Sequence, residues 1–301
     1  MARCVLVTGG LGFIGSRLCH ALLDEGASVR CVDNLSGAYA PEAGPAAAAE
    51  LAERGADVLV EDAAAEHVRG ADAVMHLAAR PGVRTRRSAA ELHEANAGLA
   101  ARLARAAGAA GARFLLVSSS SVYGNARELP TPEDAPLAPL NAYAESKVAA
   151  ERAVLSLGAD AVVARPFTVY GPGQRPEMAF ARWIAAAASG EPLPWIAAPG
   201  AARDFTYVDD AVAGLLAALR HGRPGEAYNV SGGRSVELRE AAALLAGPTG
   251  VRELPSSGAE ARVTSGCGRK SAAELGYVPR VELREGLERQ LGAATPLSFA
   301  A

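Results

Sequence analysis

The sequence predicts an α/β protein with a doubly wound parallel sheet and a smaller C-terminal region. Two observations carry this prediction: short apolar runs alternate with helical patterns along the first half of the chain, and the alternation breaks down beyond it. The runs expected to form strands are Cys4–Val7, Ser28–Val32, Asp57–Val60, Ala73–Leu77, Phe114–Val117 and Ala161–Ala164.

The stretches between these runs predict the helices and the domain boundary. Helical patterns cover Phe13–Asp24, Ala89–Ala107 and Ala142–Leu157, whereas the Ala/Pro/Gly-rich segment Ala38–Ala49 is predicted to be a flexible surface connection. Proline and glycine interrupt the chain near Arg165–Gln174. We therefore expect one domain over residues 1–165 and a smaller region over 166–301, with some later segments returning to the first domain.

Composition narrows the class of protein. The 301 residues are 50% hydrophobic and 21% charged, enough for a large core, and the formal net charge of -3 argues against nucleic acid or an anionic membrane as a partner. The chain has neither a signal-type start nor an apolar run of membrane-spanning length, so we expect a cytoplasmic protein. The four cysteines are scattered without metal-site spacing, which predicts reduced thiols and no bound metal.

A glycine-rich turn follows the first predicted strand and opens the first predicted helix. Gly9, Gly12, Phe13, Ile14 and Gly15 lie in this turn, whose spacing matches the dinucleotide fingerprint of Rossmann-type folds. A Cβ at the glycine positions would block the tight turn and the approach of backbone to a pyrophosphate, which the helix N-terminus would bind. The fold class is therefore Rossmann-type, with a dinucleotide site at this turn.

Three polar residues follow the next two strands. Asp33 can accept hydrogen bonds from an adenosine ribose and would repel a 2′-phosphate, which favours NAD over NADP. Asn34 adds no positive charge, and Arg30 is expected to point away from this site. Asp62 is placed to contact adenine, although a solvated loop aspartate explains its presence almost as well.

A tyrosine and a lysine are spaced to share one helical face. Tyr143 and Lys147 are at i and i+4, and their helix follows the fifth strand, which ends in a run of serines beginning at Ser118. Each residue has an ordinary structural explanation: a half-buried aromatic, a charge on a helix surface, a hydroxyl in a turn. Their joint position at the carboxyl edge of the sheet instead favours a catalytic site.

These motifs together resemble the extended short-chain dehydrogenase/reductases that act on nucleotide sugars, the NAD-dependent epimerase/dehydratases. The resemblance covers essentially the whole chain and rests on the glycine turn, His76-Leu77-Ala78-Ala79, Asn96, the serine run before Tyr123, Tyr143-Ala-Glu-Ser-Lys147, Arg165-Pro-Phe-Thr-Val-Tyr-Gly-Pro172 and Arg203-Asp-Phe-Thr-Tyr-Val-Asp-Asp210.

The resemblance implies a nucleotide-sugar enzyme with NAD bound by residues 1–165 and the sugar nucleotide mainly by 166–301. Leu77, Ala78, Ala79 and Asn96 would join the cofactor site, and a homodimer is expected. Tyr143 would be the base, Lys147 would lower its pKa and hold the nicotinamide ribose, and Ser119 would bind the reacting oxygen.

The residues after Ser119 bear on the reaction. Dehydratases of this family place an Asp-Glu pair there and decarboxylases a Glu, whereas this chain has Ser120 and Ser121. Without those carboxylates, return of the hydride to the opposite face of a rotated 4-ketone is the simplest outcome, which is 4-epimerisation.

The substrate is argued from the stretch Thr168–Ala179, which resembles that of UDP-glucuronate 4-epimerases. Arg175 could pair with a hexuronate carboxylate, with hydrogen bonds from Thr168, Ser120 and Ser121. Alternatively, Arg175 caps a loop or pairs with Glu177.

The nucleotide would be held by three further positions. Arg203 matches the family's diphosphate arginine, Arg262 occupies a plausible second position, and Ile196 stands where the family often has an aromatic residue on uracil.

Three other functions remain open at this point. A UDP-glucose 4-epimerase and a nucleotide-hexose dehydratase share most of these motifs, and a non-catalytic NAD-sensing protein shares the fold. Retention of Ser119, Tyr143 and Lys147 together favours an enzyme. The resemblance around Arg175 favours a UDP-sugar, UDP-glucuronate above all, as its substrate.

Overall fold

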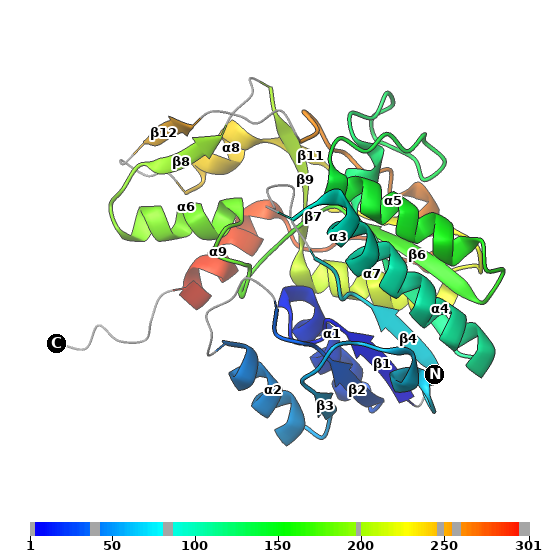
Figure 1. Cartoon of the computed structure of the whole chain (residues 1–301). Helices are drawn as coiled ribbons and strands as arrows, with labels where there is room; N and C mark the ends of the chain where they lie inside the picture. Colours follow the sequence, from blue (N-terminus) through cyan, green and yellow to red (C-terminus); the bar gives the residue numbers. More distant parts are fainter. Residues whose placement is uncertain are drawn as a thin grey trace.

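The computed structural model describes residues 4–36, 43–80, 87–196, 200–245, 250–254 and 260–294. Its centre is a seven-stranded sheet in the order β10-β6-β5-β4-β1-β2-β3, with every pair parallel (Figure 1). The strands are β1 (Cys4–Thr8), β2 (Ser28–Val32), β3 (Asp57–Leu59), β4 (Ala73–His76), β5 (Arg113–Val117), β6 (Ala161–Pro166) and β10 (Ala227–Val230). The predicted fold class is confirmed, and each expected strand lies within two residues of its predicted bounds.

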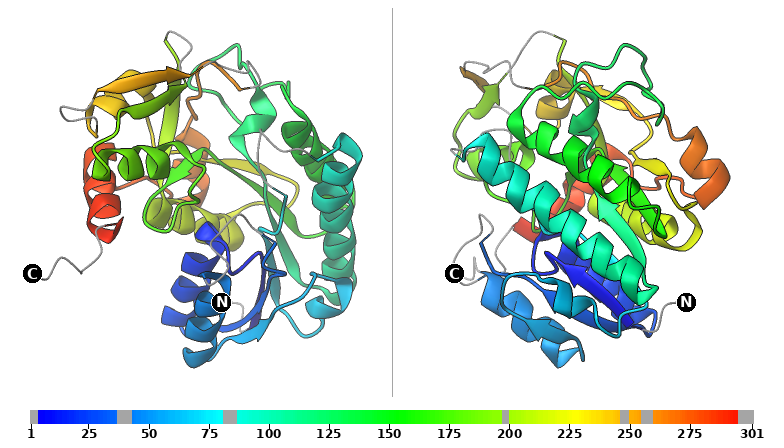
Figure 2. Two further views of the ribbon diagram at one scale, coloured as in Figure 1. Left: turned by 60° about the vertical axis from the view of Figure 1, so that its left-hand side comes forward. Right: turned by 45° about the vertical axis from the view of Figure 1, so that its right-hand side comes forward.

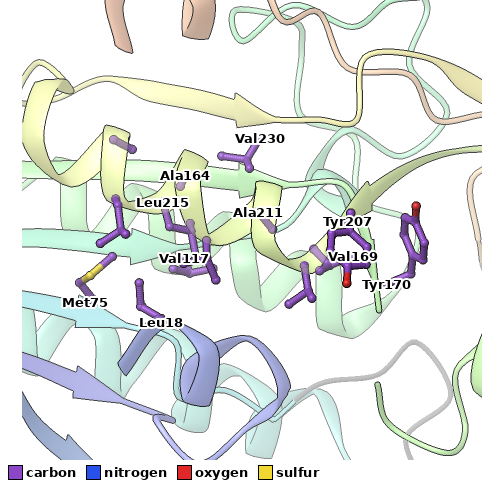
Figure 3. Packing of buried hydrophobic residues seen from close by; sticks show 14 of the residues in the cluster. Leu18, Met75, Val117, Ala164, Val169, Tyr170, Tyr207, Ala211, Leu215 and Val230 are labelled. Atoms are coloured by element: carbon purple, nitrogen blue, oxygen red, sulfur yellow. The ribbon is translucent and has the colours of Figure 1, made fainter. Parts of the chain in front are cut away.

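Helices cover both faces of this sheet (Figure 2). One face carries α1 (Phe13–Asp24), α2 (Ala43–Glu53) and α7 (Val208–His221). The other face carries α3 (Ala89–His93), α4 (Leu99–Ala110) and α5 (Ala142–Leu155). On this second face the π-helical turn η2 (Glu94–Gly98) joins α3 to α4, and the 3₁₀ turn η1 (Ala65–Val68) packs on α4. Strand residues alternate between the faces, so Val5 and Val7 belong to one apolar cluster and Leu6 to the other. Leu18 of α1 and Leu215 of α7 project toward Met75 and Val117 of the sheet (Figure 3).

The smaller region is built from short strands and helices around a group of aromatic rings. A three-stranded sheet joins β7 (Thr168–Tyr170), β9 (Ala202–Tyr207) and β11 (Ser235–Glu237), and β8 (Leu193–Ile196) pairs with β12 (Val251–Leu254). The remaining helices are α6 (Ala179–Ala188), α8 (Leu238–Ala243) and α9 (Leu283–Ala294), with the π-helical turn η5 (Ser271–Leu275). Tyr170 packs edge-on against Phe180, Phe205 and Tyr207, with ring centroids 5.3, 6.1 and 5.6 Å away. Strand β10 lies in the large sheet although it follows this region in sequence.

The segment predicted as a flexible connection is partly helical. Residues 37–42 lie outside the described part, but α2 begins at Ala43, so the prediction is wrong for the second half of Ala38–Ala49. Alanine has the highest helix propensity, and Pro45 sits in the first turn, where a missing N–H breaks no helical hydrogen bond. Leu51 anchors the helix in the core.

Among the described residues, no helix has both the length and the hydropathy needed to cross a membrane.

We expect Gly15→Ala to prevent α1 from packing against the glycine-rich turn. An added Cβ would lie 2.8 Å from Gly10 Cα and closer still to Gly9 O, and backbone cannot yield as a flexible side chain can. NAD affinity should fall at least about tenfold, and Tm should fall by several degrees. Calorimetric titration and thermal unfolding measure both. Gly292→Ala in α9 is the control, because nothing lies within 4 Å of its Cβ position; its Tm should not fall. Native NAD affinity in Gly15→Ala would contradict the packing argument.

Candidate active site

A deep cleft runs along the carboxyl ends of the sheet strands, between the sheet and the smaller region. Its volume is about 1570 Å³, and residues of both parts line it. Because all strands run parallel, their carboxyl ends and the loops that follow meet at one edge. This arrangement brings together most of the residues singled out in the sequence.

The glycine-rich turn forms one end of the cleft. Gly9, Gly12, Phe13, Ile14 and Gly15 all line it. Gly9 has φ +73°, and a Cβ there would lie 2.7 Å from the backbone nitrogen of Ala78. Gly12 is the N-cap of α1, so the first N–H groups of that helix face the cleft without helical partners. The turn thus has the shape and the donors that a pyrophosphate requires.

The predicted ribose-binding carboxylate lies next to this turn. Asp33 Oδ2 accepts a hydrogen bond from the backbone nitrogen of Leu11 at 3.1 Å, and Oδ1 from that of Leu35 at 2.9 Å. The carboxylate therefore also shapes the two backbone segments beside it. Asn34 Nδ2 donates to Asp62 Oδ1 at 2.5 Å, and both residues line the cleft.

Arg30 points away from the cleft, as the sequence predicts. Its Nε donates to Asp57 at 2.9 Å and its Nη1 to the backbone oxygens of His67 and Arg69. Arg80, which sequence reasoning missed, lines the cleft and donates from Nη1 to Ser36 O at 3.1 Å. Nothing in its sequence context marks it, because it is placed by the fold of the segment after β4.

The residues predicted to bind the cofactor after β4 differ in whether they line the cleft. Leu77, Ala78 and Ala79 line the cleft as predicted, whereas Asn96 does not. Asn96 is 2% exposed; it accepts from the backbone nitrogen of Arg80 at 2.7 Å and donates to Ser146 Oγ at 2.8 Å. Its polar atoms are satisfied inside the protein, where they hold the backbone at Arg80 against Ser146 of α5.

The predicted catalytic residues meet in the middle of the cleft. Asn141 caps α5 by accepting from the backbone nitrogen of Ala144, and the helix places Tyr143 and Lys147 on its cleft-facing side. Tyr143 is hydrogen-bonded to Ser119, and Lys147 Nζ donates to the backbone oxygen of Val117 at 2.8 Å. The three side chains predicted to act together are thus assembled at one point.

Burial dominates the ionisation of this pair. It lowers the pKa of Lys147 to about 8, with partial compensation by the negative charge of Glu151. It raises the pKa of Tyr143, while the hydrogen bond from Ser119 and the positive charge of Arg175 act in the opposite direction. The expectation that Lys147 lowers the pKa of Tyr143 is therefore not met by the protein's own groups: the cation acting on the phenol is Arg175.

The serine turn, Ser118–Tyr123, and Arg175 also contribute to the cleft. Ser120, Ser121, Thr168 and Arg175 all line it. Ser121 Oγ is buried and has no hydrogen-bond partner among the described residues. Arg175 Nη1 pairs with Glu177 Oε1 at 3.0 Å. The alternative partner considered for Arg175 is thus present, and the guanidinium nevertheless acts on Tyr143.

The far end of the cleft holds two more arginines. Arg203 and Arg262 both line it, as does Glu260, which sequence reasoning missed. Arg203 Nη2 lies 3.2 Å from Glu260 Oε2, and its Nη1 donates to the backbone oxygens of Ala202 and Arg262. The side chain of Ile196 lies outside the described part of the chain.

Comparison with known proteins agrees with this geometry. Residues 5–231 match the NAD dependent epimerase/dehydratase family. The chain belongs to this family. It is accordingly an enzyme of the NAD-dependent epimerase/dehydratase type, and NAD is its cofactor.

Relatives within the family divide between two reactions. The chain is 33% identical to a UDP-glucuronate 4-epimerase of Thermodesulfobacterium geofontis, covering 94% of each protein. It is also 33% identical to a dTDP-glucose 4,6-dehydratase of Streptomyces griseus, covering 95% of this chain and 92% of the relative. A solved UDP-glucuronic acid 4-epimerase of Bacillus cereus, in complex with UDP-glucuronic acid and NAD, superposes with a TM-score of 0.89 at 31% identity, covering 96% and 98% of the chains. Overall identity does not separate epimerase from dehydratase.

We expect Tyr143→Phe to lower kcat by about 10²–10⁴, because the sequence predicts that the phenol oxygen is the proton acceptor. NAD affinity should stay within about threefold, because the glycine turn is untouched; activity assays and calorimetric titration measure the two. Tyr277→Phe is a matched control, since Tyr277 is another buried phenol, bonded to Ser231 O at 3.0 Å, that does not line the cleft. A Tyr143→Phe variant with more than about a tenth of native kcat would exclude it as the base.

We expect Lys147→Met to lose turnover and gain stability at neutral pH. The folded pKa of about 8 lies below the ordinary 10.5, so the charged lysine destabilises the fold in full below pH 8, and this effect fades as the pH rises toward 10.5. Allowing for the lost hydrogen bond to Val117, the free energy of unfolding at pH 7 should rise by roughly 1–2 kcal/mol.

Urea unfolding at pH 7 and at pH 10 tests this sign. The advantage of Lys147→Met should shrink at the higher pH. Lys270→Met, which removes an ammonium paired with Glu226 at 2.8 Å, is the control and should not stabilise the protein. If Lys147→Met is less stable than the wild type at pH 7, the buried charge is not the dominant effect.

Proposed function

We propose that this enzyme is a nucleotide-sugar 4-epimerase that interconverts UDP-glucuronate and UDP-galacturonate through a transient 4-ketone. The observation that carries the proposal is the cation near the predicted base: Arg175 lines the cleft and its charge acts on Tyr143, and the same cleft is lined by Ser121, whose buried hydroxyl has no hydrogen-bond partner among the described residues. A carboxylate on the sugar ring would satisfy both groups.

We infer that the cofactor lies along the glycine turn, with Asp33 at its adenosine ribose and Lys147 at its nicotinamide end. Asn34, Asp62 and the Leu77–Ala79 segment would line the same half of the cleft. Arg203 and Arg262 would bind the diphosphate of the sugar nucleotide. The sugar nucleotide would contact both residues 1–165 and residues 166–301. When bound, NAD would supply the hydride acceptor for oxidation at C4 of the sugar and the hydride donor for the reverse step.

In this proposal the protein's own groups transfer one proton from the sugar and back to it. Ser119 and Tyr143 bind the 4-hydroxyl oxygen, and Tyr143 takes its proton as the carbon is oxidised. The positive charge of Arg175 favours the phenolate form of Tyr143. Lys147, which is held by its hydrogen bond to Val117 O, orients the neighbouring groups of the site. Inversion at C4 follows from hydride return to the opposite face of the rotated ketone, and Tyr143 then returns the proton to its oxygen.

Absence of an acid–base pair beside Ser119 supports epimerisation. Ser120 and Ser121 follow it, and neutral hydroxyls are too weak as acids and as bases to supply both proton transfers that loss of water from the sugar requires. Glu177 is a carboxylate in the cleft, but it is held by Arg175.

The second candidate is a dTDP- or UDP-hexose 4,6-dehydratase, favoured by the equal identity to the Streptomyces griseus enzyme. Nuclear magnetic resonance of products from a panel of UDP- and dTDP-sugars with NAD separates the candidates. A 4-epimer of the uronate supports the proposal, whereas a 4-keto-6-deoxy product from a neutral hexose replaces it.

We expect Arg175→Ala to depress kcat/KM for UDP-glucuronate by about ten- to a hundredfold, because a hydrogen bond to a charged group is worth roughly 1.5–3 kcal/mol. UDP-glucose, which lacks the carboxylate, should lose much less. The 4-keto uronate is a β-keto acid, so a carboxylate released from Arg175 should also leak CO₂ and yield a UDP-pentose, detectable by the same spectra.

Glu177→Gln is the matched control for this prediction. It removes the partner of Arg175 but leaves the guanidinium, so kcat/KM for UDP-glucuronate should be kept or rise. Equal losses in Arg175→Ala and Glu177→Gln, on charged and neutral sugars alike, would mean that the ion pair is structural and that the uronate assignment is wrong.

A further inference from the structure

The end of β5 and the residues after it contact one face of α5 three times in succession. Val117 O accepts from Lys147 Nζ, Ser118 Oγ donates to Glu151 Oε1, and Ser119 is hydrogen-bonded to Tyr143. Tyr143, Lys147 and Glu151 are spaced four apart and share one helical face. The catalytic bonds at Val117 and Ser119 therefore flank a third bond that takes no part in the chemistry.

That third bond ends on a carboxylate that is itself fixed. Arg165 donates to Glu151 from Nε at 3.1 Å and from Nη2 at 2.7 Å. The two side chains are 5% and 2% exposed, so the pair is buried at the junction of α5 and β6. Glu151 cannot move without breaking a desolvated, two-pronged ion pair.

The same arginine also holds the other end of the serine turn. Its Nη1 donates to Tyr123 Oη at 2.8 Å, and that hydroxyl donates to Asn229 Oδ1 at 2.7 Å. Tyr123 closes the 3₁₀ turn η3 (Ser120–Tyr123) that carries Ser120 and Ser121. The turn is thus attached to one ion pair at both ends.

We propose that Glu151 and Arg165 are positioning residues that hold the serine turn, through Ser118 and Tyr123, at the distance from Tyr143 that proton transfer requires. Buried ion pairs are poor sources of stability, since an apolar pair of the same volume often does as well. Orientation of a reacting group is a different matter, because a small displacement can cost a hundredfold in rate. The proposal needs only the Ser119–Tyr143 contact and not the identity of the sugar, so it applies equally to a 4-epimerase and to a dehydratase.

Ser118→Ala is the decisive variant, since it removes one hydroxyl and leaves both charges of the ion pair in place. With the sugar nucleotide that the enzyme turns over, kcat should fall about tenfold or more, while KM and NAD affinity stay within about twofold. Looser contact with Ser119 removes an interaction that lowers the pKa of Tyr143, so the acid limb of the kcat–pH profile should move to higher pH. Ser118→Thr, which keeps the hydroxyl, should recover most of the loss.

Two further variants separate positioning from stability. Tyr123→Phe releases the other end of the turn without altering a charge, and should lower kcat with the same shift of the acid limb. Ser271→Ala is the control: it removes a hydroxyl that is 0% exposed and donates to Asn229 O at 2.6 Å, and Ser271 does not line the cleft. Its Tm should fall comparably with kcat unchanged. If Ser118→Ala and Tyr123→Phe lower Tm but show the same kcat and the same acid midpoint of the kcat–pH profile as Ser271→Ala, the ion pair is structural and the proposal is wrong.

Discussion

The hydrogen bond from the Lys147 ammonium to the carbonyl oxygen of Val117 is the contact on which the rest of the cleft depends. A buried ammonium must be hydrogen-bonded, and this one finds its acceptor on the last residue of a central strand. The bond links α5 to the end of β5. Tyr143, one helical turn earlier, is thereby brought against Ser119, and Glu151, one turn later, against Ser118.

Burial of these groups opposes the ionisation that the proposed chemistry requires. It lowers the pKa of Lys147 and raises that of Tyr143, so both groups are less readily charged than in water. Such a site is tolerated because the two faces of the sheet carry large apolar clusters, packed by α1 and α7 on one side and by α4 and α5 on the other. The apolar core stabilises the fold. The cleft can therefore contain buried ionisable groups that are unfavourable for stability but required by the proposed chemistry.

Specificity in this family depends on a few side chains rather than on overall similarity. Epimerase and dehydratase relatives are equally identical to this chain over nearly its whole length, so the distinction lies in the residues that touch the sugar. The proposed function assigns this role to the serine turn and Arg175. Glu177 balances the charge of Arg175 within the protein itself, and in the proposed function a uronate carboxylate would share the guanidinium with Glu177.

By itself the sequence determined the fold class and the glycine turn, and it predicted Ser119, Tyr143 and Lys147 as one group of residues, because each of these features is encoded locally. Strand and helix periods, a tight turn that only glycine allows, and an i, i+4 pair are all properties of short segments. It failed where the pattern was ambiguous, since the alanine-rich segment from Ala43 forms a helix, and it did not show that the side chain of Asn96 is hydrogen-bonded to the backbone of Arg80. Only the tertiary structure decided that Glu151 and Arg165 pair beneath the serine turn, that Arg80 and Glu260 line the cleft, and that Arg175 supplies the charge felt by Tyr143. These contacts join residues from different strands, helices and loops, and side-chain burial, which sets their pKa values, exists only once those elements are packed together.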